Sequence, residues 1–285
     1  MPTLTTSTTQ FCFDYRAGKS VELNERDGAL EVVRKKIRGW SDLSTRIGDV
    51  IRQAFDEAVM ASKHGKFAVS ELDKTEKAYI GLRVQLLLQG EFELSGGGKL
   101  DCNIADHEVD IKFTLGSNWM IPREATGELC LLLKADEAAA TFSLGLLRTT
   151  SARLNAGGNQ DKKRTISAAG KREISWIASA APMPANFFLK IGQDRLSAIL
   201  RQPAGQSRIT ELFRLVQREV IPRTAICLLA SQDDPMKRAR DARKRLNSEG
   251  IVVLCGRNRD QKQRARDLGF KLTAREWLSA KRRSL

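Results

Sequence analysis

The first hundred residues carry the hydrophobic spacing of amphipathic helices. Between Asp27 and Ser62, apolar residues recur at steps of three and four, a pattern that predicts helical structure across most of this stretch. A second such stretch, SELDKTEKAYIGLRVQLLLQGEF, opens at Ser70 and predicts a helix that runs through Gln85 to about Gln89. Helices therefore precede any sheet in this chain.

The pattern then changes to that of strands. FELSGG predicts a short strand, and KLDCNIADHEVDIKFTL predicts two strand segments around a turn near Ala105. ELCLLLKAD and TFSLGLLRT are apolar runs of strand length, typical of central strands of a mixed sheet. The fold class expected for this part is therefore α/β, a mixed sheet with flanking helices.

The second half reads as a separate, mainly helical domain. NAGGNQDKKRTISAAGKR is rich in glycine and charge, which predicts a linker. Short helical patterns follow it, with the strand GIVVLCG among them, and this combination fits a winged helix-turn-helix module. The expected organisation is an N-terminal extension (1–25), a first domain (26–156), a linker (157–172) and a DNA-binding domain (173–285).

The charge is divided unevenly between these halves. The formal net charge is +14. The stretch from Gly158 to the C-terminus holds 28 Lys and Arg against 12 Asp and Glu, whereas the first 157 residues hold 20 against 22. A basic half beside a nearly neutral one indicates a polyanionic partner, and nucleic acid is the commonest one; a merely solvated surface is the alternative.

Other classes of site find little support. The five cysteines are odd in number and form no C-x-x-C pair, which argues against a disulfide framework and a thiolate zinc site. No apolar run has the length of a membrane span, and the polar start MPTLTTSTTQ does not resemble a signal peptide. These features predict a cytoplasmic protein without a membrane partner.

The candidate chemistry lies in the predicted hairpin. Asp110 and Lys112 are two residues apart and share a strand face, and Asp101 lies on the adjoining segment across a short turn. Two close carboxylates suit Mg²⁺, and a lysine beside them can position water or stabilise charge on a phosphate. This is the D…D-x-K pattern of the PD-(D/E)xK nucleases. An exposed hairpin with alternating charges has the same spacing and remains the alternative.

Several stretches together resemble the NaeI-type restriction endonucleases. They include LDKTEKAYIGLRVQLLLQGEFEL, HEVDIKF, WMIPREATGELCLLL, RITELFRLVQREVIPRTAI, SQDDPMKRAR and EGIVVLCGRNRDQKQRARDLGF, which occur in order between about residues 45 and 272. The chain is similar, more distantly, to the MutH and Sau3AI nucleases. The resemblance implies a restriction-endonuclease-like first domain and a CAP-like winged-helix domain that binds a second, effector DNA.

The resemblance also implies roles for residues. Asp101 and Asp110 would be metal ligands for Mg²⁺, with Mn²⁺ as a substitute, and Lys112 the catalytic lysine. The family's fourth catalytic position, normally glutamate on the preceding helix, is Gln85 here. It further implies a homodimer that engages double-stranded DNA at two sites, and a cognate DNA methyltransferase in the same system.

The function expected from all this is a Mg²⁺-dependent type II restriction endonuclease. Gln85 motivates one alternative, a weakened or inactive DNA-binding relative, and a MutH-like nickase is another. Basic residues of the second domain are the predicted DNA contacts, most of them to phosphate. They are Arg208, Arg214, Arg218, Lys237, Arg238 and Arg240.

Overall fold

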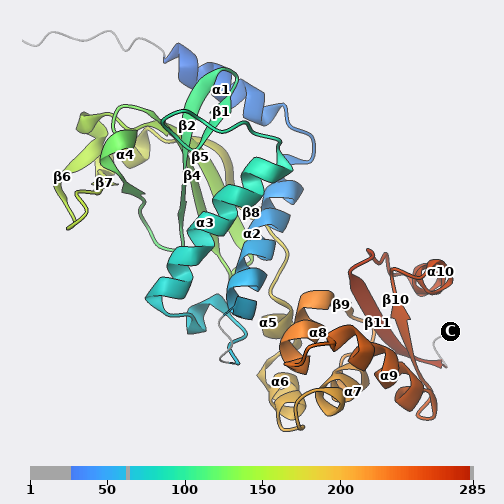
Figure 1. Ribbon diagram of the computed structural model, residues 1–285. Coiled ribbons are helices and arrows are strands. Elements are labelled where there is room, and N and C mark those ends of the chain that lie inside the picture. Colours follow the sequence, from blue (N-terminus) through green and yellow to red (C-terminus); the bar gives the residue numbers. More distant parts are fainter. Residues whose placement is uncertain (1–26, 62–64, 283–285) are drawn as a thin grey trace, which may run out of the picture.

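The computed structural model describes residues 27–61 and 65–282, so the expected extension of residues 1–25 lies outside the described residues. Two bodies are visible in Figure 1, which we name the sheet region (residues 27–183) and the C-terminal region (residues 184–282). No helix within the described ranges is long and apolar enough to cross a membrane.

The sheet region contains four α-helices and eight strands within its described residues. Its helices are α1 (Gly28–Arg38), α2 (Leu43–Ala61), α3 (Lys74–Glu91) and α4 (Ala168–Arg172). Its strands are β1 (Cys102–Ile104), β2 (His107–Thr114), β3 (Met120–Ile121), β4 (Leu129–Asp136), β5 (Thr141–Arg148), β6 (Leu154–Gly158), β7 (Arg164–Ile166) and β8 (Ser175–Pro182). Three short 3₁₀ turns, η1 (Val69–Glu71), η2 (Arg123–Ala125) and η3 (Ser151–Arg153), complete it.

The expected mixed sheet is confirmed. Its strand order is β1-β2-β4-β5-β8, with β2 and β4 parallel and the other neighbours antiparallel. The predicted turn near Ala105 joins β1 to β2, and Ala105 and Asp106 both adopt positive φ there. The stretch FELSGG forms no strand: residues 92–97 are turn and irregular structure after α3.

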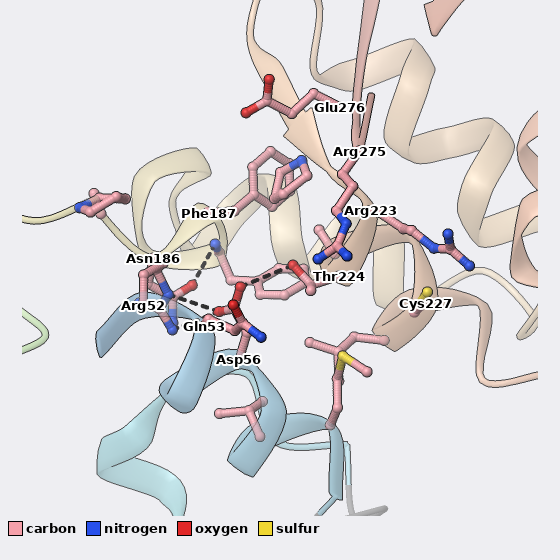
Figure 2. A pocket seen from close by; sticks show the side chains of 18 of the residues that line it. Arg52, Gln53, Asp56, Asn186, Phe187, Arg223, Thr224, Cys227, Arg275 and Glu276 are labelled. Atoms are coloured by element: carbon pink, nitrogen blue, oxygen red, sulfur yellow. Dashed lines mark hydrogen bonds and ion pairs between the residues drawn. The ribbon is translucent and has the colours of Figure 1, made fainter. Parts of the chain in front are cut away.

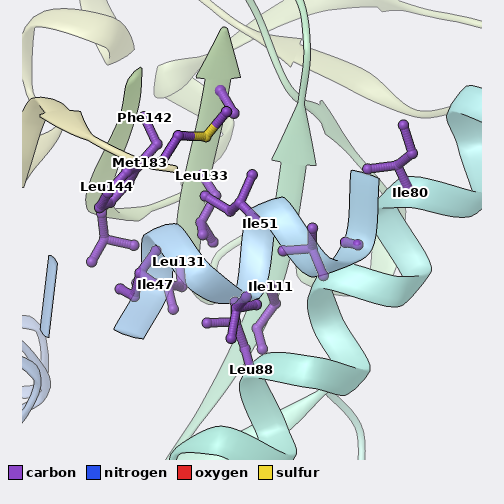
Figure 3. Close-up of a cluster of buried hydrophobic side chains, with 14 of the residues drawn as sticks. Ile47, Ile51, Ile80, Leu88, Ile111, Leu131, Leu133, Phe142, Leu144 and Met183 are labelled. Atoms are coloured by element: carbon purple, nitrogen blue, oxygen red, sulfur yellow. The ribbon is translucent and has the colours of Figure 1, made fainter. Parts of the chain in front are cut away.

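Helices α1, α2 and α3 pack on one face of this sheet (Figure 1). Ile51 of α2 and Leu88 of α3 meet Ile111, Leu131 and Leu144 of the strands in one apolar cluster (Figure 3). Because successive strand residues point to opposite faces, the neighbours of these buried residues, among them Asp110 and Lys112, point to the other face. Packing of the apolar residues against the helices thus determines that the candidate catalytic residues lie on the opposite face of the sheet.

That other face is covered by a small second sheet of order β3-β7-β6. Residues 157–172, expected as a linker, instead hold the end of β6, the strand β7 and the helix α4. β8 then returns to the large sheet beside β5, so the boundary of the sheet region falls after it. Glycine and charge in this segment mark a hairpin tip, where Asn159 and Lys163 bond to each other through their main chains.

The C-terminal region is mainly helical, as expected, and encloses a second apolar core. Its helices are α5 (Phe187–Ile191), α6 (Gln193–Leu200), α7 (Gln206–Leu215), α8 (Arg223–Ala230), α9 (Pro235–Asn247) and α10 (Arg259–Asp267). Its strands β9 (Val220–Pro222), β10 (Ile251–Cys255) and β11 (Glu276–Lys281) form an antiparallel sheet of order β10-β11-β9.

Candidate active site

The predicted catalytic residues converge at the β1–β2 hairpin. Asp101 lies immediately before β1, while Asp110 and Lys112 lie on β2. The Lys112 Nζ is 2.7 Å from Asp110 Oδ2 and 3.9 Å from Asp101 Oδ2. One ammonium group therefore faces both carboxylates, which share a single site rather than two separate surface positions.

Asp101 is held by hydrogen bonds on both carboxylate oxygens. Its Oδ2 accepts a hydrogen bond from the Ile111 main-chain N–H at 2.7 Å. The Asp101 side chain thus continues the contact between β1 and β2 just before β1 begins. Its Oδ1 accepts from the Gln85 amide at 2.7 Å, and its main-chain carbonyl accepts from Gln89. These contacts fix the carboxylate between α3 and β2 and prevent the free rotation of an exposed aspartate.

Asp110 is the buried member of the pair, only 4% exposed. Burial raises the pKa of Asp110 to about 6, and the hydrogen bond from Lys112 only partly opposes that rise. The Cys130 thiol donates to Asp110 Oδ2, the same oxygen that Lys112 contacts, at 3.8 Å. Burial also raises the pKa of Cys130 to about 12, so it stays a neutral thiol, as expected for these cysteines.

Gln85 occupies the expected place on α3 and contacts the site directly. Its amide nitrogen meets Asp101, so the position where the resemblance implies glutamate supplies a donor here. Glu76 does not replace the missing carboxylate: it closes the capping box of α3 with Asp73 and pairs with Lys66 at 2.6 Å. The helix begins at Lys74, after Asp73, rather than at Ser70.

Sequence reasoning missed three polar groups around this site, namely Gln89, Cys130 and Thr149. Gln89 could have been found, because it follows Gln85 by four residues and therefore shares its helix face. Cys130 and Thr149 lie on or beside central strands, and the Cys130 Sγ is 3.5 Å from the Thr149 Oγ1. Only the strand register, Asp110 opposite Cys130, brings them to the site.

The donor set fits a hard divalent cation. Two aspartates that face one ammonium group offer oxygen ligands from the same side of the hairpin. Within residues 27–61 and 65–282, no three His, Cys, Asp or Glu side chains cluster as a complete metal cage. A cation bound through two carboxylates and several waters is the arrangement that Mg²⁺ favours.

The predicted DNA contacts on and after α7 are partly engaged within the protein. The Arg208 guanidinium donates to the main-chain carbonyls of Gln202 and Leu200. Arg214 is bound by Glu211 and by Glu249, and the hydrogen bond to Glu249 raises its pKa. Arg218 is exposed, and its guanidinium carbon lies 5.5 Å from the Phe270 ring centroid.

The contacts predicted on α9 are more available. Lys237 and Arg240 are exposed near the start of the helix, and Arg240 lies 3.8 Å from Asp234. Arg238 is half-buried, and its Nε finds no hydrogen-bond partner within the described residues. The same helix buries Ala239, Ala242 and Leu246, so its basic face points away from the core.

A cavity of about 760 Å³ separates the sheet region from the C-terminal region (Figure 2). Its lining residues come from α2, α5, α8 and β11 and include none of the candidate catalytic residues. Beside it lies a buried polar network, in which Arg52 meets Asp56 at 2.7 Å and Glu137 at 3.0 Å. Thr224 of α8 donates to Asp56 at 3.0 Å, which joins the two regions.

Comparison with known proteins bears directly on this site. The family model described as Restriction endonuclease NaeI matches residues 32–283. The type II restriction enzyme NaeI of Lentzea aerocolonigenes is 31% identical over 261 residues, which cover 88% of this chain and 82% of that enzyme. Both matches span the sheet region and the C-terminal region, and the chain belongs to the NaeI family of restriction endonucleases.

Proposed function

We propose that this protein is a type II restriction endonuclease that cleaves double-stranded DNA at a specific site. Family membership supports the activity. The convergence of Asp101, Asp110 and Lys112 is the observation that supports the location of the catalytic centre in the sheet region. We propose this group as the catalytic centre of a PD-(D/E)xK nuclease.

Asp101 and Asp110 would hold Mg²⁺, with Mn²⁺ as a substitute. The bound ion supplies Lewis-acid stabilisation of the phosphate charge and a more acidic water. The protein's own residues do the rest: Ile111 and Gln89 orient Asp101, and the Lys112 ammonium stabilises negative charge that develops on the scissile phosphate. The Cys130 thiol that contacts Asp110 is neutral, so it brings no second negative charge next to this carboxylate.

The C-terminal region is proposed to be a winged helix-turn-helix domain. After α5 and α6, its elements follow in the order α7, β9, α8, α9, β10, α10 and β11, with β11 in the centre of the sheet. In such a domain α9 would be the recognition helix. Lys237 and Arg240, with Lys244 one further turn along, are exposed at steps of three and four on one face of α9.

This domain would bind the second, effector DNA copy. Its separation from the β1–β2 hairpin supports two distinct DNA sites in one chain (Figure 1). Lys237, Arg238 and Arg240 are the proposed contacts on α9, with Arg218 beside them in the domain. For Arg208 and Arg214 the proposal requires that the guanidinium groups contact phosphate while they keep their internal partners. A cognate DNA methyltransferase remains a prediction of the same system.

The homodimer also remains a proposal, and one surface supports it. Tyr79, Leu82 and Leu86 are exposed on α3 at steps of three and four, an apolar stripe that no element of the described residues covers. We expect Leu82→Asp with Leu86→Asp to shift the protein from dimer to monomer in sedimentation analysis. Val32→Asp, an equally exposed apolar residue on α1, is the control that should leave the dimer intact. A native chain that sediments as a monomer with DNA bound would contradict the dimer.

Gln85 decides how well the centre works, and it can be tested by one substitution. Gln85→Glu would replace an amide that donates to Asp101 by a third carboxylate, which we expect to lower the Mg²⁺ concentration for half-maximal cleavage about tenfold. Native and variant chains are incubated with supercoiled DNA that carries many different sites, over a range of Mg²⁺ and Mn²⁺ concentrations. Discrete linear fragments from the native chain are expected.

The products separate the alternatives. Cutting by the Gln85→Glu chain alone would identify the native protein as a catalytically weakened DNA-binding relative. The hydrogen bond between the Gln85 amide and Asp101 is the observation that favours this reading, because it occupies one ligand oxygen. Open circles without linear product would instead identify a MutH-like nickase. The absence of strand breaks from both chains would contradict the proposed nuclease.

A further inference from the structure

A cationic notch lies on the face of the sheet that carries the candidate catalytic residues. Its lining is Arg123 and Thr126, in and beside η2, with Lys162 and Arg164 of the β6–β7 hairpin. The space between them measures about 450 Å³, and no carboxylate lines it. Three positive charges around one hollow are the arrangement that a phosphate group requires.

The charges of this notch are largely uncompensated. Arg123 and Lys162 are exposed, and neither makes an ion pair or a side-chain hydrogen bond within the described residues. The nearby acids do not fill this role: Glu124 does not line the notch, and Asp161 lies 3.7 Å from the Lys163 ammonium. Cations elsewhere on this face are engaged, since Arg153 pairs with Glu173 and Lys171 donates to a main-chain carbonyl.

The notch is also built to keep its shape. Arg164 donates to three main-chain carbonyls, those of Asn155, Ser151 and Leu154, which hold its guanidinium against the small sheet. Its strand pairs with β3, where Ile121 stands opposite Arg164, two residues before Arg123. The hairpin and η2 are thus held together by strand pairing.

A short chain of contacts connects this notch to the catalytic carboxylates. The Ala125 carbonyl, in η2 beside Thr126, accepts from the Thr149 hydroxyl at 2.5 Å. Thr149 Oγ1 lies 3.5 Å from the Cys130 Sγ, which lies 3.8 Å from Asp110 Oδ2. Two buried side chains therefore separate η2, the element that carries Arg123, from Asp110.

We propose that Arg123, Lys162 and Arg164 bind a backbone phosphate of the DNA substrate close to the bond that is cut. This inference rests on the proposed function. It assigns binding of the substrate DNA to the sheet region, while the basic C-terminal region keeps the effector DNA. The notch positions the duplex over Asp110 and Lys112 and carries no base recognition of its own.

The test uses the full chain and compares Arg123→Ala/Lys162→Ala with a control of equal charge loss. Lys36→Ala/Lys74→Ala is the control, because both lysines are exposed on helices that pack on the opposite face of the sheet. DNA affinity is measured with Ca²⁺ in place of Mg²⁺ over a series of salt concentrations. Cleavage is measured as kcat and KM separately.

We expect the notch variant to lower the slope of log affinity against log salt by about 1 to 2, as for one or two lost phosphate contacts. We also expect kcat/KM to fall about tenfold, with part of the loss in kcat, because a misplaced phosphate reacts slowly even when bound. The control should leave both values at the native level. Arg123→Lys keeps the charge and should retain most of the native slope.

A second variant guards against misfolding. Lys162→Glu reverses one charge at an exposed hairpin turn, so it should keep the native melting temperature and still weaken DNA binding. Native values of slope and kcat/KM in both notch variants would overturn the proposal. A native chain that binds but does not cut DNA would contradict the proposed function. The comparison of DNA affinity between the notch variants and the control would still test the phosphate site. A native chain that does not bind DNA would overturn both.

Discussion

Replacing Asp110 by asparagine should abolish DNA cleavage and leave DNA binding intact. The substitution keeps the size of the side chain but removes the negative charge that faces Lys112 at 2.7 Å and that would bind the cation. Loss of about 4 kcal/mol of transition-state stabilisation corresponds to a rate lower by about a thousandfold. Plasmid cleavage under saturating Mg²⁺, followed over hours, measures the effect.

Asp106→Asn is the matched control for this experiment. Asp106 lies in the turn of the same hairpin at a φ of 64°, which asparagine tolerates well, and its side chain is exposed. The same chemical change four residues away should therefore leave both cleavage and stability unchanged. Cleavage by Asp110→Asn at the native rate would remove Asp110 from the catalytic centre, whatever the control showed.

The sequence was sufficient to predict the candidate centre because its geometry is local. The alternation of β2 places Asp110 and Lys112 on one face, and the short turn at Ala105 brings Asp101 back beside them. Gln85 is assigned to the centre by the resemblance to the NaeI-type endonucleases, and in the structure its helix brings it to Asp101. Each of these relations joins residues within about thirty positions of one another in the chain.

The features that the sequence did not reveal depend on contacts between residues that are far apart in the chain. β8 pairs with β5 across 29 to 41 residues, and its half-exposed stretch SWIASAAP lacks the continuous apolar run of a central strand. The β6–β7 hairpin has the composition of a linker, because its glycines and charges serve an exposed turn. One of the two partners of Arg214 follows the same rule, because Glu249 is thirty-five residues away.

The network between the two regions is a second place where a single change should have a large effect. Arg52 and Glu137 are both 9% exposed, and Asp56 is the second carboxylate beside Arg52. Glu137 also accepts from the Val69 N–H at 2.6 Å and from the Asn186 amide at 2.9 Å. One carboxylate thus satisfies three donors, from α2, from η1 and from the residue that caps α5.

Glu137→Ala should therefore lower the free energy of unfolding by about 3 to 5 kcal/mol, the range for a buried ion pair that loses one partner. Arg52 would keep only Asp56, whose pKa burial already raises. The Val69 N–H would lose its acceptor, and the Asn186 amide would lose one of its two acceptors. Denaturant unfolding measures the change. Because two regions can unfold separately, it should be followed through fluorescence of the tryptophans in both regions and through circular dichroism.

Two further variants divide the effect between charge and domain contact. Glu137→Gln retains a carbonyl acceptor without the charge, so its cost should fall below that of Glu137→Ala. Thr224→Val removes only the hydrogen bond from α8 to Asp56, and it should cost about 1 kcal/mol. If the Glu137→Ala protein had the same denaturant midpoint of unfolding as the native protein, the network would contribute nothing to stability. A loss confined to the C-terminal region's transition would show that Glu137 acts through Asn186 and the start of α5 rather than through the core of the sheet region.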